Sequence, residues 1–145
     1  MKYIDIENDV LEKLEALVDG DIVRSVNSYG GEFSPDSFGQ TSIQTPSIYA
    51  HVSGLQNDPQ GDVDMRSYSV TVYAVDRNLR GESDTRHGVY EICDAVRSAL
   101  NRASICGAGT LELNRETLVG YSRAINVCVM QIDFTLPLDE PIIVI

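Results

Sequence analysis

A chain of 145 residues is large enough for one hydrophobic core, and 43% hydrophobic with 23% charged residues excludes a disordered, collagen-like or disulfide-scaffold protein. The formal net charge of −11 disfavours sequence-specific binding of nucleic acid, because that binding depends on neutralising phosphates with lysine and arginine. We interpret the acidic excess as a solvated surface; the alternatives are opposite-signed patches that meet between subunits, or an acidic wall along a DNA channel.

The cysteines and the start of the chain indicate a reducing compartment. Three cysteines form no CxxC pair and leave an odd number, so no disulfide framework is expected. No apolar run approaches the roughly 18 residues that cross a bilayer, and residues 1–7 lack the pattern of a secretory signal. We therefore expect a cytosolic protein that does not enter a membrane.

The N-terminal third predicts a helix, a short strand and a long loop. Leucine and valine recur at helical spacing over residues 5–18, and Gly20 follows as a stop. Residues 22–26 are a short β-type run. Residues 27–46 are rich in serine, glycine, glutamine and threonine, so we expect a long flexible loop there, either mobile or occupied by a partner.

The middle of the chain predicts a hairpin followed by a second helix. Residues 47–53 and 66–75 alternate between apolar and polar side chains, as half-buried strands do, and residues 55–64 between them are rich in turn formers. The second helix is expected to follow an N-cap at Ser83 and Asp84. Its apolar stripe consists of Val89, Ile92, Cys93, Val96, Ala99 and Leu100.

The C-terminal third predicts further strands at residues 110–113 and 122–136. Residues 125–134 are apolar on both faces, which is typical of a central strand that is covered on both sides. The order of elements predicts a single α+β domain, residues 1–145, in which two main helices pack on one face of a largely antiparallel β-sheet.

No catalytic motif fits its context. Residues 120–124 (GYSRA) resemble a nucleophile elbow, but both histidines precede the serine and a strand is expected after it. The glycines of residues 107–109 lack the third glycine of a dinucleotide fingerprint. The cysteines and histidines lack the spacing of a zinc site, and Asp58, Asp62 and Asp64 lack that of a calcium loop. We therefore expect no enzyme, no cofactor and no metal site.

Two segments indicate contacts with other subunits. The chain ends in an apolar segment, residues 141–145, that either packs on its own sheet or adds as a strand to a neighbour. The connection 76–86 places three arginines beside three acids, as either a solvated loop or an inter-subunit contact. The candidate interface residues are Arg77, Arg80, Arg86, Ile142, Ile143, Val144 and Ile145.

A resemblance to a known family rests on four segments in order. These are ENDVLEKLEALV, TPSIYAHVSG, VTVYAVDRNLRG and GVYEICDAVRSALN, which span most of the chain. The succession resembles the small tail proteins of Mu-like phages and prophages, and its layout is similar to the tail terminator family of long-tailed bacteriophages. By position, the resemblance points to Arg77, Arg80, Tyr90 and Arg97 as matching places.

The resemblance implies a phage structural protein, a tail terminator or tail completion subunit. Such a subunit would form a homo-oligomeric ring, a hexamer, that caps the tail tube and joins it to the neck. Its partners would be further copies of itself, the tail tube protein and the neck or connector proteins. It would be assembled in the bacterial host cytoplasm and reside in the virion tail. A head-tail connector, another minor tail protein, or a small adaptor that binds one partner through residues 27–46 are the alternatives.

Overall fold

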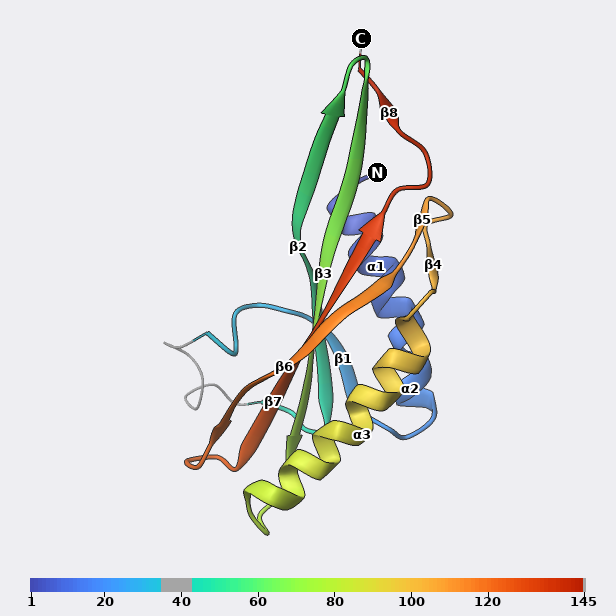
Figure 1. The fold of residues 1–145 in the computed structure, drawn as a ribbon. Coiled ribbons are helices and arrows are strands. Elements are labelled where there is room, and N and C mark those ends of the chain that lie inside the picture. The colour runs from blue at the N-terminus through green and yellow to red at the C-terminus, as the bar shows by residue number, and fades with distance from the viewer. Residues whose placement is uncertain (35–42, 145) are drawn as a thin grey trace.

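The computed structural model describes residues 1–34 and 43–144, which form a mixed main sheet with helices on one side and a small two-stranded sheet of β4 and β5 (Figure 1). The helices are α1 (Tyr3–Leu14), α2 (Ala16–Asp19) and α3 (Glu82–Leu100). The strands are β1 (Ser25–Ser28), β2 (Ser47–Gln60), β3 (Val63–Arg77), β4 (Ser104–Ile105), β5 (Gly109–Thr110), β6 (Glu112–Ser122), β7 (Val127–Pro137) and β8 (Ile142–Ile143). The main sheet has the order β1-β2-β3-β7-β6, with β8 also paired to β3, and only β1 and β2 run parallel.

The predicted α+β class, with two main helices on one face of a largely antiparallel sheet, is confirmed. Helix α1 buries Ile6, Val10 and Leu14, which recur every four residues and so share one face. Helix α3 buries a corresponding stripe, and both helices share one core with the sheet, in which Ile132 and Phe134 are fully buried. This apolar core is what holds the helices on the sheet.

The predicted cap of the second helix is wrong. Ser83 and Asp84 lie inside the first turn of α3, and Gly81 occupies the N-cap with φ 125°, a conformation that glycine adopts far more readily than other residues. The hydroxyl of Thr85 binds the backbone at the start of the helix: its Oγ1 lies 2.8 Å from the carbonyl oxygen of Gly81 and 3.1 Å from that of Asn78. The helix therefore begins where a glycine allows the chain to turn, not at a side-chain cap.

The hairpin of β2 and β3 is longer than predicted, and the expected turn over residues 55–64 is wrong. Both strands continue until only Gly61 and Asp62 connect them, and Gly61 has the positive φ of 65° that a tight turn needs. Pro59 is tolerated in β2 because that part of the strand is an edge. We call residues 55–66 together with β8 the arm; in Figure 1 the arm extends beyond the ends of the helices.

The strand predicted over residues 122–136 is β7, which begins later than predicted, at Val127. Residues 123–126 turn between β6 and β7, and Asn126 has φ 54°, which asparagine tolerates better than most residues. Most of β6 escaped prediction because its side chains are largely polar and none of them is fully buried, as suits an edge strand. Strand β7 lies between β3 and β6, so the expected central position is confirmed.

The other face of the sheet carries a second, aromatic cluster. Tyr29 and Phe33, from the predicted loop 27–46, pack on Tyr49 and Tyr73 of the sheet, with ring centroids 4.5 to 5.3 Å apart. The start of the loop is therefore anchored: residues 27–28 belong to β1 and Phe33 is buried. Residues 35–42 lie outside the described residues. Burial in this cluster raises the pKa of Tyr73 to about 12.

Candidate assembly surfaces

Strand β3 separates the candidate interface residues into two groups. It runs from Val63 to Arg77, so at a rise of about 3.3 Å per residue its ends lie about 45 Å apart. The arginines of the predicted interface lie at the Arg77 end, near the start of α3. Strand β8 pairs with the Val63 end, in the arm (Figure 1). The two predicted segments are therefore two separate surfaces.

The first surface is an arginine end made by two connections. Arg77 pairs with Val127 of β7, and Val127 pairs with Ser122 of β6 on its other side. Arg123, which follows Ser122 in the turn, therefore lies at the same end of the sheet. Within the described residues, the guanidinium groups of Arg77, Arg80 and Arg123 make no hydrogen bond or ion pair. This end of the molecule therefore offers cationic groups that are free to bind.

Leu79 lies between Arg77 and Arg80 in the connection to α3. Its side chain is 76% exposed, the highest value among the large hydrophobic residues of the described chain. Arg86 differs from the other predicted arginines, because it belongs to α3 and pairs with Glu82 one turn earlier at 3.2 Å. The free part of the predicted connection is thus the short segment 77–81.

The second surface contains the C-terminal segment. Ile142 is level with Asp64 and Ile143 with Val63, and the amide of Val144 donates to the carbonyl oxygen of Asp62 at 2.8 Å. The segment therefore packs on its own sheet, one of the two predicted arrangements. Ile143 and Val144 nevertheless stay 72% and 48% exposed, while Ile145 lies outside the described residues.

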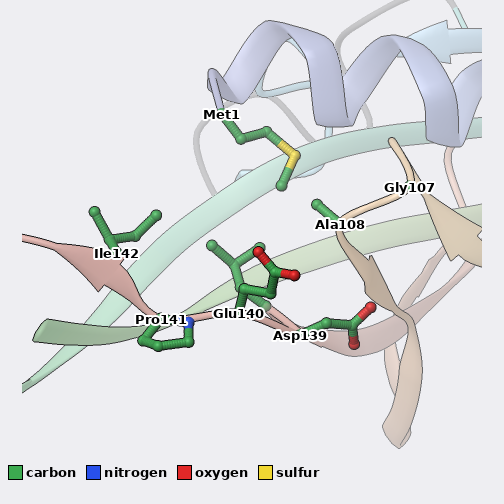
Figure 2. A pocket seen from close by; sticks show the side chains of 8 residues that line it. Met1, Gly107, Ala108, Asp139, Glu140, Pro141 and Ile142 are labelled. Carbon is green, nitrogen blue, oxygen red and sulfur yellow. The ribbon is translucent and has the colours of Figure 1, made fainter.

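A cavity of about 380 Å³ adjoins this segment (Figure 2). Three parts of the chain that are distant in sequence line it: Met1, the turn between β4 and β5, and residues 138–142. The amide of Asp139 donates to the carbonyl oxygen of Ala108 at 2.8 Å, and this bond holds the second and third parts together. Sequence reasoning missed this cavity because no local pattern signals contacts between such distant segments.

A close approach of backbone fixes one wall of the cavity. Gly109 forms a bridge with Leu138, and a Cβ at this position would collide with the carbonyl oxygen of Pro137. At the other wall, the hydroxyl of Tyr68 donates to the carbonyl oxygen of Met1 at 3.2 Å. The cavity is therefore built by specific contacts on both sides.

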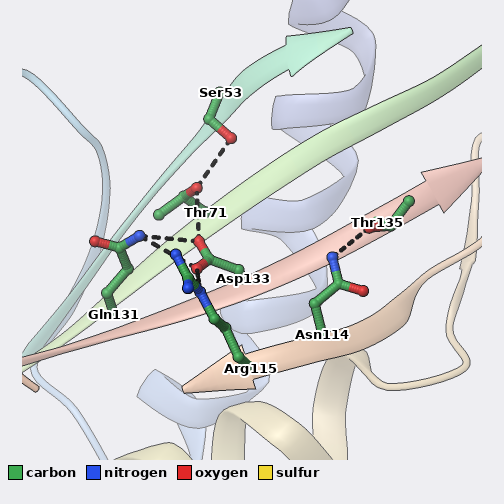
Figure 3. Close-up of polar contacts among 7 residues, drawn as sticks. All are labelled: Ser53, Thr71, Asn114, Arg115, Gln131, Asp133 and Thr135. Carbon is green, nitrogen blue, oxygen red and sulfur yellow. Dashed lines mark hydrogen bonds and ion pairs between the residues drawn. The ribbon is translucent and has the colours of Figure 1, made fainter. Parts of the chain in front are cut away.

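The open face of the sheet near the arm is polar and bonded within itself (Figure 3). The carboxylate of Asp133 accepts from Gln131 Nε2 at 3.0 Å and from Arg115 Nε at 3.2 Å, and Thr71 Oγ1 lies 3.2 Å from it. Asn114 donates to the hydroxyl of Thr135 on the same face. These bonds join side chains of β3, β6 and β7 across this face of the sheet.

The two helix residues that the resemblance singled out differ in their surroundings. Tyr90 is 45% exposed on α3, with its ring centroid 6.1 Å from that of His87. Nη2 of Arg97 donates to both carboxylate oxygens of Glu116 on β6, at 2.9 and 3.1 Å, and Nη1 lies 3.1 Å from the carboxylate of Asp94. Arg97 therefore ties α3 to the edge strand.

Two of the three cysteines lie in the core. Cys93 and Cys128 are buried, and burial raises their pKa to about 12 and about 11. Cys106 is exposed at the turn after β4.

Across residues 1–34 and 43–144, no group of three histidine, cysteine or acidic side chains could hold a metal ion. Within the same residues, no helix has the length and apolar character that crossing a membrane requires.

Comparison with known proteins gives the family. The model of the family described as Bacteriophage Mu, Gp37 matches residues 2–134. The chain belongs to the Bacteriophage Mu Gp37 family. The resemblance to proteins of Mu-like phages that the sequence indicates is thereby confirmed for this Gp37-family chain.

A solved structure shares the fold of this Gp37-family protein. A chain of the "Virion of native gene transfer agent (GTA) particle" is similar with a TM-score of 0.58 and 11% sequence identity. The match covers 90% of this chain and 92% of that chain, so the shared fold extends over nearly the whole domain. Among curated proteins, no match is found.

Proposed function

We propose that this Gp37-family protein is a phage structural protein, the tail terminator or tail completion subunit, which forms a ring that caps the tail tube and joins it to the neck. The observation that carries the proposal is that two different candidate assembly surfaces lie at opposite ends of β3. A subunit with two unlike ends makes heterologous contacts, which close into a ring when the rotation between neighbours allows it.

Two comparisons support this function. The family is named after a protein of bacteriophage Mu, and the structure that shares the fold comes from a virion particle. Both fit a protein that works inside a phage-like assembly in the tail of the virion, after synthesis in the host cytoplasm.

The proposed mechanism depends on the shape and charge of the subunits and involves no catalytic step. Each subunit of the ring, a hexamer in our proposal, satisfies its neighbour's surface, and one ring face stops growth of the tail tube while the other receives the neck. With a net charge of −11 per subunit, the ring would bind DNA phosphates poorly, so DNA could pass through it without sticking.

Deletion of the reading frame from the phage genome tests the function. We expect particles whose tails vary in length and lack heads in electron micrographs, and we expect expression of the protein in trans to restore whole virions. Tails of uniform length without heads would favour a connector role at the neck. Normal virions from the deletion strain would contradict any essential place in the tail.

A further inference from the structure

The segment 77–81 has the form of a projecting binding element. A single exposed leucine is common on protein surfaces. Here, however, the most exposed large hydrophobic side chain of the described residues, Leu79, lies between Arg77 and Arg80, whose guanidinium groups make no hydrogen bond or ion pair within the described chain. An apolar tip between two cations suits an apolar hollow with a negatively charged rim.

The cavity beside β8 has these properties. Met1, Ala108 and Ile142 give it apolar walls, and Figure 2 shows the carboxylates of Asp139 and Glu140 beside it. Both acidic residues are exposed, and their side chains make no hydrogen bond or ion pair within residues 1–34 and 43–144. At about 380 Å³, the cavity has room for a leucine side chain.

The element and the cavity of one chain cannot meet. They lie near opposite ends of β3, an extended strand whose ends are about 45 Å apart. Any pairing between them must therefore join two copies. The charges agree with this, since segment 77–81 carries two arginines and no acid, while Asp139 and Glu140 place two carboxylates at a cavity whose lining includes one cationic group, the α-amino group of Met1.

We propose that segment 77–81 of one copy docks into the cavity beside β8 of the next copy, with Leu79 inside and with Arg77 and Arg80 paired to Asp139 and Glu140. The contact is heterologous, so every copy gives one element and receives another. Arginine suits the role because its planar group pairs with carboxylates in two-point geometry. This inference rests on the proposed function, because both require copies of the chain to associate, and it identifies the interface between them.

Charge reversal at each end, followed by mixing, tests the proposal. The first variant carries Arg77→Glu and Arg80→Glu, and the second carries Asp139→Arg and Glu140→Arg. Alone, each places like charges at every contact and should run as a monomer in size exclusion with light scattering, at a concentration where the wild type assembles. In an equimolar mixture the two variants can alternate around the ring, and every contact between them then pairs opposite charges. The mixture should therefore regain the wild-type mass.

Matched controls change the same charges elsewhere. Arg24→Glu with Arg102→Glu, and Glu12→Arg with Glu15→Arg, alter exposed side chains that make no ion pair in the described structure. Both control variants should assemble like the wild type. Leu79→Asp should also abolish assembly, whereas Leu118→Asp on β6, where the side chain is 48% exposed, should not.

Three outcomes overturn the docking contact. These are reversal variants that assemble alone, a mixture that stays monomeric, or a wild-type chain that never self-associates. The deletion phenotype is scored separately, so an assembling wild type with unaffected variants would reject this interface and leave the tail function standing.

Discussion

Strands β2 and β3 run through both the body of the domain and the arm, yet their surroundings differ in the two regions. In the body, Val70, Val72 and Ala74 of β3 lie under helices α1 and α3, and Val75 lies in the aromatic cluster on the other face. In the arm, the same strand carries exposed Met65, and its neighbours are β2 and the short β8. The comparison indicates that the body provides most of the stability of the fold, while the arm provides an exposed surface for contacts with another protein.

The arm is weak as an isolated structure. A two-stranded ribbon is marginally stable in water, and β8 adds only the pairs with Val63 and Asp64. Apolar side chains that such a ribbon leaves exposed are typical of a surface that meets another protein. The difference between body and arm can be tested by changes placed in each.

The largest expected effect is in the body. Phe134→Ala removes a fully buried ring from the core and should lower the free energy of unfolding by about 3–5 kcal/mol. Met65→Ala in the arm, where the side chain is 36% exposed, should lower it by less than about 1 kcal/mol. Urea unfolding followed by circular dichroism measures both. Equal losses would show that the arm belongs to the cooperative core.

The junction of body and arm should be sensitive to one methyl group. Gly109→Ala places a Cβ against the carbonyl oxygen of Pro137, which backbone movement alone can relieve, so we expect a loss of about 1–3 kcal/mol and weaker assembly. Gly54→Ala is the control, because nothing lies within 4 Å of its added Cβ. The same urea experiment compares them, and a neutral Gly109→Ala would argue that the cavity wall is not fixed.

The ion pair that ties α3 to β6 should contribute less. The side chain of Arg97 is 39% exposed and solvent screens the charge, so the coupling with Glu116 should be at most about 1 kcal/mol. A double-mutant cycle with Arg97→Ala and Glu116→Ala measures it, and added salt should reduce it. A coupling of several kcal/mol would place this pair among the main supports of the body.

The reactivity of the three thiols should distinguish buried from exposed cysteines in the folded protein. At pH 8 one cysteine, Cys106, should react with a thiol reagent in the folded protein, because it is exposed, whereas Cys93 and Cys128 are buried and burial raises their pKa to about 12 and about 11. All three should react after unfolding, and Cys106→Ser should abolish the folded-state reaction. Rapid labelling of a second thiol in the native state would mean that the body opens more readily than its packing indicates.

The sequence predicts the elements that bury a regular apolar pattern. The stripe of α3 and the strands around Ile48 and Val72 follow from periodicity alone, because each buries one face. The arm was missed because Asn57, Asp58 and Pro59 favour turns locally, while cross-strand pairing with β3 keeps them extended. Local preference fails where tertiary pairing decides.

The candidate surfaces were predictable to different degrees. Arg77 and Arg80 could be selected because arginines in a short connection are free to bind. The cavity was not predictable, since Met1, Ala108 and Ile142 meet only through the folded chain. Leu79 carried a usable signal, an apolar residue between two cations in a loop, which a search for catalytic motifs does not detect.

The most direct test of this account is the solution mass of the wild-type protein across concentration and salt, by light scattering behind size exclusion. The account predicts a ring-sized species that dissociates as salt screens the arginine and carboxylate contacts. It also predicts that Leu79→Asp removes this species while the fold is kept. A strict monomer under all conditions would contradict the claim that the two ends of β3 join copies of this chain.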